Sequence, residues 1–305
     1  MHHTVDHILK MPLLHALPEG VTPLPLGEAV LLRRDAPSAI EGTLYRPLMC
    51  LILQGAKDVT AGRHAVHCPA GHAIVVSHDL PVLSQITQAT AEAPYMALVL
   101  PLDLGLLRSF YDQMPPVAEA PAPQAALVSQ PAGDALVGAV GRLLALAEGG
   151  KDAALLGPII LREIHARLLL SPQGAVLRRF LHRDDPSNHL ARAITMTRSS
   201  LDAPLSVTDL AETVGMSRSS FHAHFKAVIG QSPGQYQKDI RLLEARRMIR
   251  ESRAAISAVA YDVGYESPAQ FSRDYARKFG QPPRADRKGM IADPEGQSTL
   301  AAVAG

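Results

Sequence analysis

Between residues 44 and 100 the chain alternates short apolar runs with turn residues. The run MCLILQG ends at Gly55, and AKDVTAGRHAVHC divides at Ala61-Gly62. PAGHAIVVSHDLP opens on a turn and becomes apolar, and YMALVLPL is a further apolar run. Runs of this length, bounded by glycine and proline, predict strands. Several of them in succession predict a small barrel or sandwich.

Helical patterns follow this strand-rich part. A helix is expected near residues 103–113, and two apolar helices are expected at 134–147 and 153–170. Helices that are apolar over much of their surface must be buried, either against the barrel or against a second subunit. The proline- and alanine-rich stretch 114–126 predicts a surface loop, and the prolines of residues 1–42 predict extended segments with a partial helix.

One pattern of residues occurs twice, at 206–226 and at 256–278. Each copy has a small residue, then a glycine, then aromatic residues at helical spacing, which is the layout of a helix-turn-helix. The small residue lets two helices cross closely, and the glycine tolerates the positive φ of a tight turn. The corresponding positions are Ala211 and Ala260, Gly215 and Gly264, Phe221 and Phe271, and Phe225 and Tyr275.

Polar residues mark the start of the second helix in each copy. Ser217 is expected to cap the helix of the first copy, and Ser267-Pro268 places a cap before a proline at the first helical position. An amphipathic helix with Tyr236 and Ile240 on its apolar face joins the two copies. A duplicated helix-turn-helix joined in this way indicates DNA binding far more specifically than an isolated one.

Composition and charge agree with this interpretation. The chain has 305 residues, enough for two domains with a core each. The formal net charge of +1 divides unevenly: residues 189–288 carry 16 Lys and Arg against 10 Asp and Glu, and residues 1–188 carry 14 against 17. The basic part is therefore the part with the repeated motif, as neutralisation of DNA phosphates requires.

The sequence lacks marks of a membrane or secreted protein. No run reaches the roughly 18 apolar residues that a membrane span needs, and the first residues do not resemble a signal peptide. The two cysteines cannot build a disulfide framework. These features predict a cytoplasmic protein.

The segments FHAHFKAVIGQSPGQYQKDIRLLEARRMI and VAYDVGYESPAQFSRDYARKFGQPP resemble the DNA-binding domain of the AraC/XylS family of bacterial transcription regulators. The resemblance covers residues 190–288 and implies a sequence-specific regulator that binds double-stranded promoter DNA, with RNA polymerase as a further partner. Such a protein would be associated with the nucleoid when bound to DNA.

The segments CLILQGAKDVTAGRHAVHCPAGHAIVVSHDLPVLSQI and LREIHARLLLSPQGAVLRR are similar to the cupin-like N-terminal domain of a subset of these regulators and to its helical extension. This resemblance implies a domain that binds a small-molecule effector and forms a homodimer. The fold expected for the chain is α+β: a cupin-like β-barrel with flanking helices, then an all-α domain.

The expected boundaries follow. Residues 1–185 form the effector and dimerisation domain, with its helical part at about 127–182, and residues 186–288 form the DNA-binding domain. The stretch 184–188, Asp-Asp-Pro-Ser-Asn, is expected to be the hinge between them, and residues 289–305 a flexible tail.

The second helix of each motif is expected to lie in the major groove. Arg273 would bond a guanine and Gln270 an adenine, whereas Arg218, Lys226, Arg277 and Lys278 would contact phosphates. By the resemblance, the DNA-contacting positions are Arg218, Ser219, His222, Ala223, Lys226, Ala269, Gln270, Ser272, Arg273, Arg277 and Lys278.

Three groups of residues also have a structural interpretation. Gln270 stands three residues after Ser267 and could close a capping box. His224 points to the aromatic side of its helix and is expected to be packed. The arginines of the connecting helix are expected to form a solvated face or internal ion pairs; they are Arg246, Arg247, Arg250 and Arg253.

Histidines and cysteines gather in the predicted barrel: His64, His67, Cys68, His72 and His78. His64 and His67 are three positions apart, which places them on opposite faces of a strand, and no glutamate follows them as in metal-binding cupins. No metal, cofactor or catalytic site is therefore expected. Effector candidates are Cys50, His67, Cys68 and His78; each cysteine could instead be a small packed residue, or a thiol that reacts with an electrophile.

Two other functions are compatible with parts of this pattern. An enzyme would rest on the barrel alone and would need a metal, which analysis of the purified protein would detect. An architectural DNA-bending protein would bind without sequence preference and would not need a folded domain of this size in front of it.

Overall fold

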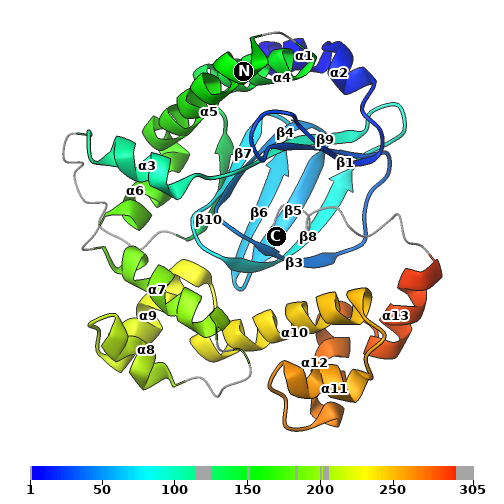
Figure 1. Ribbon diagram of the computed structural model, residues 1–305, viewed down its shortest axis with the longest axis vertical. Coiled ribbons are helices and arrows are strands. Elements are labelled where there is room, and N and C mark those ends of the chain that lie inside the picture. The colour runs from blue at the N-terminus through cyan, green and yellow to red at the C-terminus, as the bar shows by residue number, and fades with distance from the viewer. Residues whose placement is uncertain are drawn as a thin grey trace.

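The computed structural model describes residues 2–114, 125–149, 152–182, 185–199, 201 and 206–292. Three predicted segments lie partly outside these ranges. The residues outside them are 115–124 of the predicted loop 114–126, Asp184 of the predicted hinge and 293–305 of the predicted tail. The N-terminal part consists of two antiparallel sheets with helices on one side, and the C-terminal part is entirely helical (Figure 1). This is the predicted class.

The two sheets face each other. The first has the order β1-β2-β9-β4-β7-β10 and the second the order β3-β8-β5-β6. All paired strands are antiparallel. The strands are β1 (Gly20–Pro23), β2 (Val30–Arg34), β3 (Glu41–Tyr45), β4 (Leu48–Gln54), β5 (Ala56–Ala61), β6 (His64–Pro69), β7 (His72–Val76), β8 (Leu80–Gln88), β9 (Tyr95–Pro101) and β10 (Leu127–Pro131).

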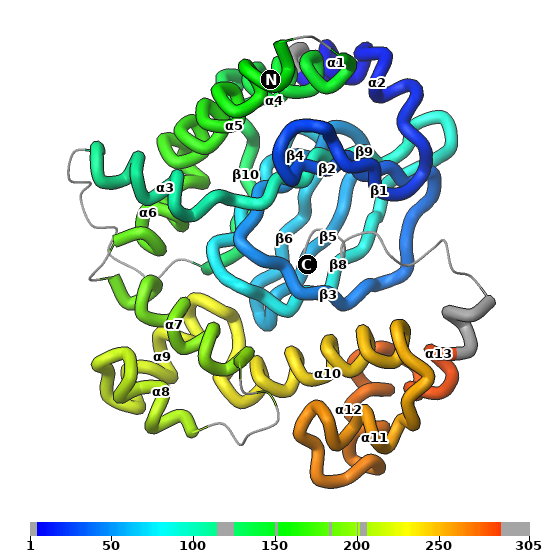
Figure 2. Tube along the Cα trace, viewed as in Figure 1, coloured from blue at the N-terminus to red at the C-terminus, as the bar shows by residue number. Residues whose placement is uncertain are grey.

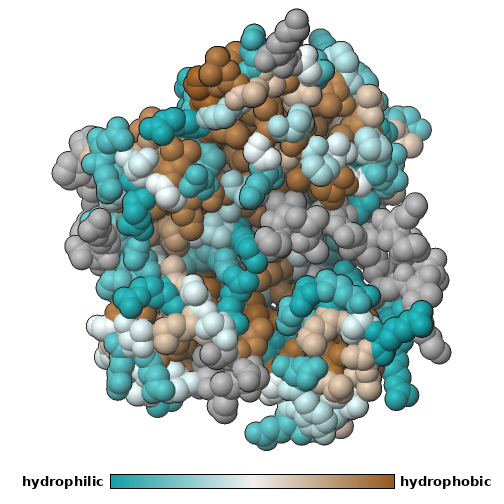
Figure 3. Space-filling view, viewed as in Figure 1, coloured by the Kyte–Doolittle hydropathy of each residue, from teal (hydrophilic) through white to brown (hydrophobic). Residues whose placement is uncertain are grey.

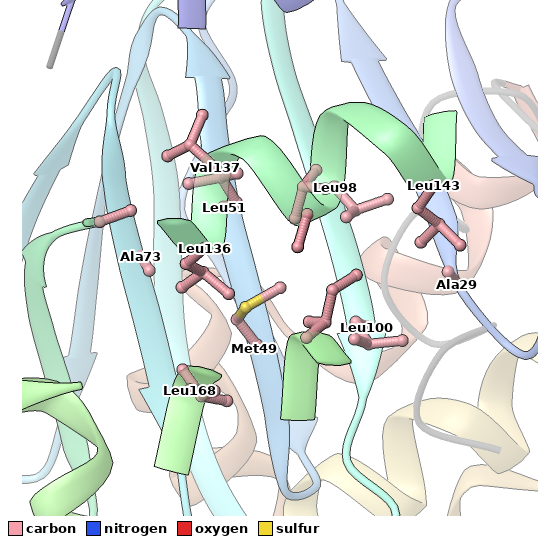
Figure 4. Packing of buried hydrophobic residues seen from close by; sticks show 14 of the residues in the cluster. Ala29, Met49, Leu51, Ala73, Leu98, Leu100, Leu136, Val137, Leu143 and Leu168 are labelled. Carbon is pink, nitrogen blue, oxygen red and sulfur yellow. The ribbon is translucent and has the colours of Figure 1, made fainter. Parts of the chain in front are cut away.

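The apolar run of β4 is buried on both faces because it lies between two cores. Met49 and Leu51 belong to the core under the helices, whereas Cys50 and Ile52 belong to the core between the sheets. Figure 4 shows the first of these cores, with Met49 and Leu51 facing Leu136 and Val137. A strand covered on both sides reads as continuously hydrophobic, since neither face meets water.

The helices of the N-terminal part cover the outer face of the first sheet (Figure 1). Two of them, α4 and α5, have the predicted bounds. The set is α1 (His2–Leu9), α2 (Pro12–His15), α3 (Leu104–Tyr111), α4 (Asp134–Ala147), α5 (Ala153–Leu170) and α6 (Ala175–Leu181), with a short 3-10 turn at Pro172–Gly174.

The start of the chain and the region after α3 contain more regular structure than expected. Residues 2–42 form α1, α2, β1 and β2 and begin β3, although extended segments and a partial helix were predicted for residues 1–42. β10 was not predicted; it adds an edge strand beside β7. Its sequence, LVSQP, is short and ends in proline, so its strand signal is weak without the neighbour that pairs with it.

The helical C-terminal part runs along one side of the sheets. α10 (Pro233–Glu251) passes beside β3 and β8 and joins the two helix-turn-helix units (Figures 1 and 2). The remaining helices are α7 (Pro186–Ser199), α8 (Val207–Thr213), α9 (Arg218–Ile229), α11 (Ile256–Asp262), α12 (Pro268–Phe279) and α13 (Pro283–Ala292).

Two predicted boundary segments are shorter than expected. Residues 186–188 of the predicted hinge are the first turn of α7, because Pro186 stands at a position where a helix does not need an N–H donor. α13 continues through Ala292 into the segment predicted as a tail.

The two helix-turn-helix units differ in how they are packed. The aromatic residues of the first unit lie in the same hydrophobic core as the barrel interior, whereas the second unit has a core of its own. The first unit therefore shares its core with the sheets. The second is held by its own core and by α10, and its α12 also contacts β3.

Candidate DNA-binding surface and barrel interior

The second helix of each unit begins and ends in the same way. Ser217 caps α9 by accepting the backbone N–H of Ser220 at 3.2 Å, and Ser267 caps α12 by accepting that of Gln270 at 3.4 Å. Gly230 and Gly280 end the two helices with φ of 87° and 77°, a left-handed conformation that favours glycine. The caps fix where each recognition helix starts and stops.

The turns that precede these helices have the predicted geometry. Gly215 has a φ of 69° and Gly264 a φ of 80°. Phe221 and Phe225 are fully buried in the first unit, as are Phe271 and Tyr275 in the second. Because the aromatic face of each helix is buried, the opposite face is turned to solvent.

The predicted DNA-contacting side chains lie on this outer face. All five on α9 are exposed, and four of the six on α12 are exposed. Ser272 and Lys278 are half-buried, and Lys278 forms an ion pair with Asp239 at 3.0 Å. Lys278 is therefore already engaged by α10, which the sequence did not indicate.

A buried carboxylate organises the polar residues of α12. Asp274 is 2% exposed. Its carboxylate forms ion pairs with Lys238 of α10, at 2.6 Å, and with Arg277. Burial alone would raise the pKa of Asp274, but hydrogen bonds from Lys238 and Gln270 and the charge of Arg277 bring it below its ordinary value. The acidic residue was not singled out from the sequence, since a lone Asp on a helix is usually exposed.

Gln270 takes part in this network and does not close a capping box. Its Nε2 donates to Asp274 Oδ2 at 3.1 Å, and its Oε1 accepts from Arg273 Nη2 at 2.7 Å. The side chains expected to read adenine and guanine are thus in contact with each other on the surface of α12.

The other structural interpretations agree with the contacts. His224 is half-buried. Arg246 pairs with Asp286 at 2.9 Å, and Arg247 pairs with Glu244 at 2.6 Å and with Glu251. The connecting helix therefore uses arginines in internal ion pairs.

Direct main-chain contacts join the barrel to the end of α9. The N–H of Arg63, in the β5–β6 hairpin, donates to the carbonyl of Gly230 at 3.0 Å, and that of Ala126 donates to Val228 at 2.9 Å. His64 Nε2 lies 3.0 Å from the carbonyl of Ala227. These groups satisfy carbonyls that the last turn of a helix leaves without partners.

The β7–β8 loop makes a second set of interdomain contacts. Asp79 pairs with Arg198 of α7, and its carbonyl accepts from the Tyr236 hydroxyl at 3.0 Å. His78 Nε2 bonds the Ser187 carbonyl at 2.8 Å, and its ring stacks edge-on against Phe180. Burial lowers the pKa of His78 to about 4, against the hydrogen bond to Ser187 and the charge of Asp79.

The four predicted effector candidates separate in the structure. Cys50 and Cys68 lie between the sheets, whereas His67 is on the outer face in contact with Asp58 at 2.6 Å, and His78 lies at the domain interface. Burial raises the pKa of the Cys50 thiol and raises that of Cys68 to about 11. Both thiols are therefore protonated near neutral pH and are poor nucleophiles.

Within the described ranges, no three His, Cys, Asp or Glu side chains come close enough together to hold a metal ion. The barrel histidines instead contact protein groups: His64 bonds Ala227, and His72 bonds Ser129 at 3.3 Å. None of the helices in the described residues is long and apolar enough to span a bilayer.

The fold and this surface define a two-part DNA-binding protein, with a duplicated helix-turn-helix attached to a two-sheet domain. Comparison with known proteins gives the family. The model for the AraC-type transcriptional regulator N-terminus matches residues 25–176, and a helix-turn-helix domain model matches residues 210–289. The chain belongs to the AraC-type transcriptional regulators.

Curated relatives match about a third of this chain. A putative AraC-like transcription regulator from Streptomyces lividans is 37% identical over 99 residues, covering 32% of this chain and 33% of the relative. The regulator GbdR of Pseudomonas aeruginosa is 30% identical over 118 residues, covering 39% of this chain and 32% of the relative. The chain thus spans about a third of the length of the curated relatives that it matches.

Among solved structures, the fold resembles that of ToxT from Vibrio cholerae. An apo structure of a ToxT variant aligns with a TM-score of 0.54 at 10% identity, covering 89% of this chain and 99% of that one. ToxT bound to an unsaturated fatty acid aligns equally well, at 11% identity. At this identity the likeness concerns the fold alone.

Proposed function

We propose that the protein is a sequence-specific regulator of transcription that binds promoter DNA through α9 and α12 and is controlled by a small molecule bound in its N-terminal domain. The observation that carries the proposal is the pair of recognition helices, capped and ended alike, with exposed polar faces and a common support in α10. The two units would occupy successive major grooves about 34 Å apart on one side of the duplex.

Each predicted contact residue has a role in this proposal. Arg273 and Gln270 would read bases, and the hydrogen bond between them would restrict the positions of both side chains. Arg218, Lys226 and Arg277 would contact phosphates. Lys278 would have to leave Asp239 to do so, so its contribution to DNA affinity is expected to be small. Ala223 and Ala269 could offer only methyl contacts, as to thymine.

The test is a binding selection from random duplex DNA with the full chain, followed by footprinting on the selected site. The expected result is a pair of half-sites protected on one face of the duplex, with affinity that falls steeply as salt is raised. Enrichment of no sequence, with binding that depends on salt alone, would favour the DNA-bending alternative and contradict the proposal.

Effector control is supported by the way the sheets hold the first unit. The β5–β6 hairpin and the β7–β8 loop both contact the DNA-binding part through hydrogen bonds. A Cβ added to Gly230 would come 2.4 Å from the Ala61 carbonyl, so the two backbones have no room to move independently. A ligand that shifts β5 would therefore shift the end of α9.

A homodimer through α5 is the third part of the proposal. Leu155 is 71% exposed, Ile159 58% and Leu170 69%, an unusual number of large apolar side chains on one helix. In Figure 3, apolar surface appears along the upper edge of the molecule, where Figure 1 places α4 and α5. Ala166 lies on the same face of the helix, and the exposed Arg162 stands between Ile159 and Ala166.

The dimer is tested with Ile159→Glu, which puts a charge on this face of α5, and with Ala91→Glu, at an exposed loop position, as a control for the added charge alone. Sedimentation of the wild type and the control should give twice the monomer mass, and Ile159→Glu should give the monomer. A dimer that survives Ile159→Glu would place the interface elsewhere. RNA polymerase is proposed as a further partner, and the bacterial cytoplasm, at the nucleoid when DNA is bound, as the site of action.

A further inference from the structure

One lysine side chain is enclosed between the two sheets. Lys57, on β5, is 2% exposed, and its Nζ donates to the Tyr45 hydroxyl at 2.8 Å. Among the described residues it forms no ion pair with a carboxylate. An ammonium group has three N–H donors and no acceptor. One donor is used by Tyr45, and the charge has no counter-charge in contact with it.

The Cys50 and Cys68 thiols near Lys57 are neutral near pH 7, as is the Tyr95 hydroxyl beside Cys50, because burial raises the pKa of each. The Tyr95 hydroxyl is fully buried and has no nitrogen or oxygen hydrogen-bond partner in the described part of the chain. The interior therefore holds a polar cluster that is short of acceptors and carries a positive charge.

Enclosing such a charge is costly. Transfer of an ammonium group out of water costs several kcal/mol even after the protein relaxes. An alkyl side chain of similar length would fill the same space between the sheets without that cost. The lysine is therefore better explained by an anion that it receives than by packing.

A small cavity leads to Lys57. Its volume is about 20 Å³, and the polar side chains of Arg34, Ser38, Glu41, Ser84 and Gln85 line it together with Lys57. This volume is room for about one water-sized group. One oxygen of a carboxylate can occupy this space, whereas the rest of a ligand would have to remain at the mouth of the cavity or push the strands apart.

Two cations, Arg34 and Lys57, and one carboxylate, Glu41, line this cavity, and Arg34 also lies 4.0 Å from Glu19. Its carboxylate, Glu41, feels the cations Arg34, Arg250, Arg246 and Lys57, and burial still raises its pKa. Two of these cations, Arg246 and Arg250, come from α10, because β3 packs against that helix. The cavity thus lies between the sheets and the helix that joins the two helix-turn-helix units.

We propose that this cavity receives the carboxylate of a small acidic effector, with Lys57 as its principal ligand. The proposal rests on the proposed function, of which it specifies the effector class. The carboxylate oxygens would take the two remaining donors of Lys57 and the Ser84 hydroxyl. Binding would add negative charge beside Glu41 and next to the arginines of α10, so the position of the second helix-turn-helix unit would respond to occupancy.

The first experiment measures thermal unfolding of the full chain with acetate, propionate and benzoate as probes. Sodium chloride at equal ionic strength controls for screening, acetamide is the neutral isostere of acetate, and inorganic phosphate tests for a general anion site. Ligand that binds only the folded state raises Tm with concentration. At least one carboxylate should raise Tm above the chloride control while acetamide does not. A response to none of the carboxylates, or an equal response to acetamide or phosphate, would refute the proposal.

Variants assign the response to the site. Lys57→Met should abolish the carboxylate-dependent rise in Tm, and Lys10→Met, at an exposed lysine, should leave it unchanged. Glu41→Gln removes the competing carboxylate and should lower the apparent Kd severalfold, an effect that a purely structural Lys57 would not produce. If Lys57→Met does not fold, Glu41→Gln decides: unchanged or weaker binding contradicts the proposal.

The DNA selection described above separates this inference from the proposed function. If the protein binds carboxylates through Lys57 but selects no DNA sequence, the carboxylate site is supported and the proposed regulatory function is refuted. If the protein binds a specific DNA sequence but does not respond to any carboxylate, the carboxylate site is refuted and the proposed regulatory function is supported.

Discussion

Gly264 and Gly215 occupy equivalent turns, yet their replacement by alanine should differ in cost. Both have positive φ, so an added Cβ costs roughly 1 to 2 kcal/mol of conformational strain in either turn. Around Gly215 no described atom lies within 4 Å of the added carbon. At Gly264 it would lie 2.8 Å from the Leu201 carbonyl and 2.7 Å from Arg241 Nη2.

A Cβ at position 264 would disturb two hydrogen bonds of Arg241. Arg241 donates from Nε to the Leu201 carbonyl at 2.6 Å and from Nη1 to the Gly264 carbonyl at 3.0 Å. Hydrogen bonds that involve a charged group contribute about 1.5 to 3 kcal/mol each. Weakening one of them adds to the strain, so Gly264→Ala should cost about 3 kcal/mol or more, and Gly215→Ala about 1 to 2 kcal/mol. Gly264→Val should cost still more, because a β-branched residue adopts positive φ least readily.

The assay is urea unfolding of the full chain followed by circular dichroism, with amide hydrogen exchange to measure α11 and α12 separately from α8 and α9. The loss of protection should be confined to α11 and α12 in Gly264→Ala, since that unit has a core of its own. Equal losses of unfolding free energy for the two alanine variants would refute the role given to Arg241 and Leu201.

Three further predictions follow from the same contacts. Arg273→Ala should lose roughly 1 to 3 kcal/mol of discrimination at one or two base pairs. Lys226→Ala should weaken binding to all sequences and lower the slope of log affinity against log salt concentration by about one. An unchanged base preference for Arg273→Ala in a selection would contradict the assignment. Burial lowers the pKa of His78 to about 4, so on acidification the unfolded state binds a proton before the folded state does. The stability that neutral His78 contributes is therefore complete above its ordinary pKa of 6.5, and it declines as the pH falls from 6.5 through 4. The total loss is roughly 3 kcal/mol, and His78→Gln should remove this pH dependence from urea unfolding; an unchanged slope would refute it. Gly62→Ala should loosen the barrel from α9, since its Cβ would lie 2.5 Å from the Gly230 carbonyl; increased hydrogen exchange at Arg63 but not in α12 is expected, and protection equal to wild type at Arg63 would contradict it.

Local features of this protein could be predicted from its sequence alone. Gly215 and Gly264 could be assigned to turns because few other residues adopt positive φ, and Ser217 and Ser267 to caps because a short hydroxyl side chain reaches the free N–H groups of a helix start. Amphipathic periodicity was sufficient to place the outer face of each recognition helix. The length of the apolar stretches 134–147 and 153–170 was sufficient to place α4 and α5.

Tertiary structure decided which polar groups are buried and what they contact. Asp274 is buried because α12 packs against α10, and Lys57 is buried because two sheets close over β5; in the sequence each looks like an ordinary exposed residue. His67 and Cys68 are adjacent, yet one points to solvent and the other into the barrel, and only the pairing of β6 with β5 fixes which. Alternation along a strand assigns two faces but does not say which face is inside, since that depends on partners distant in the chain.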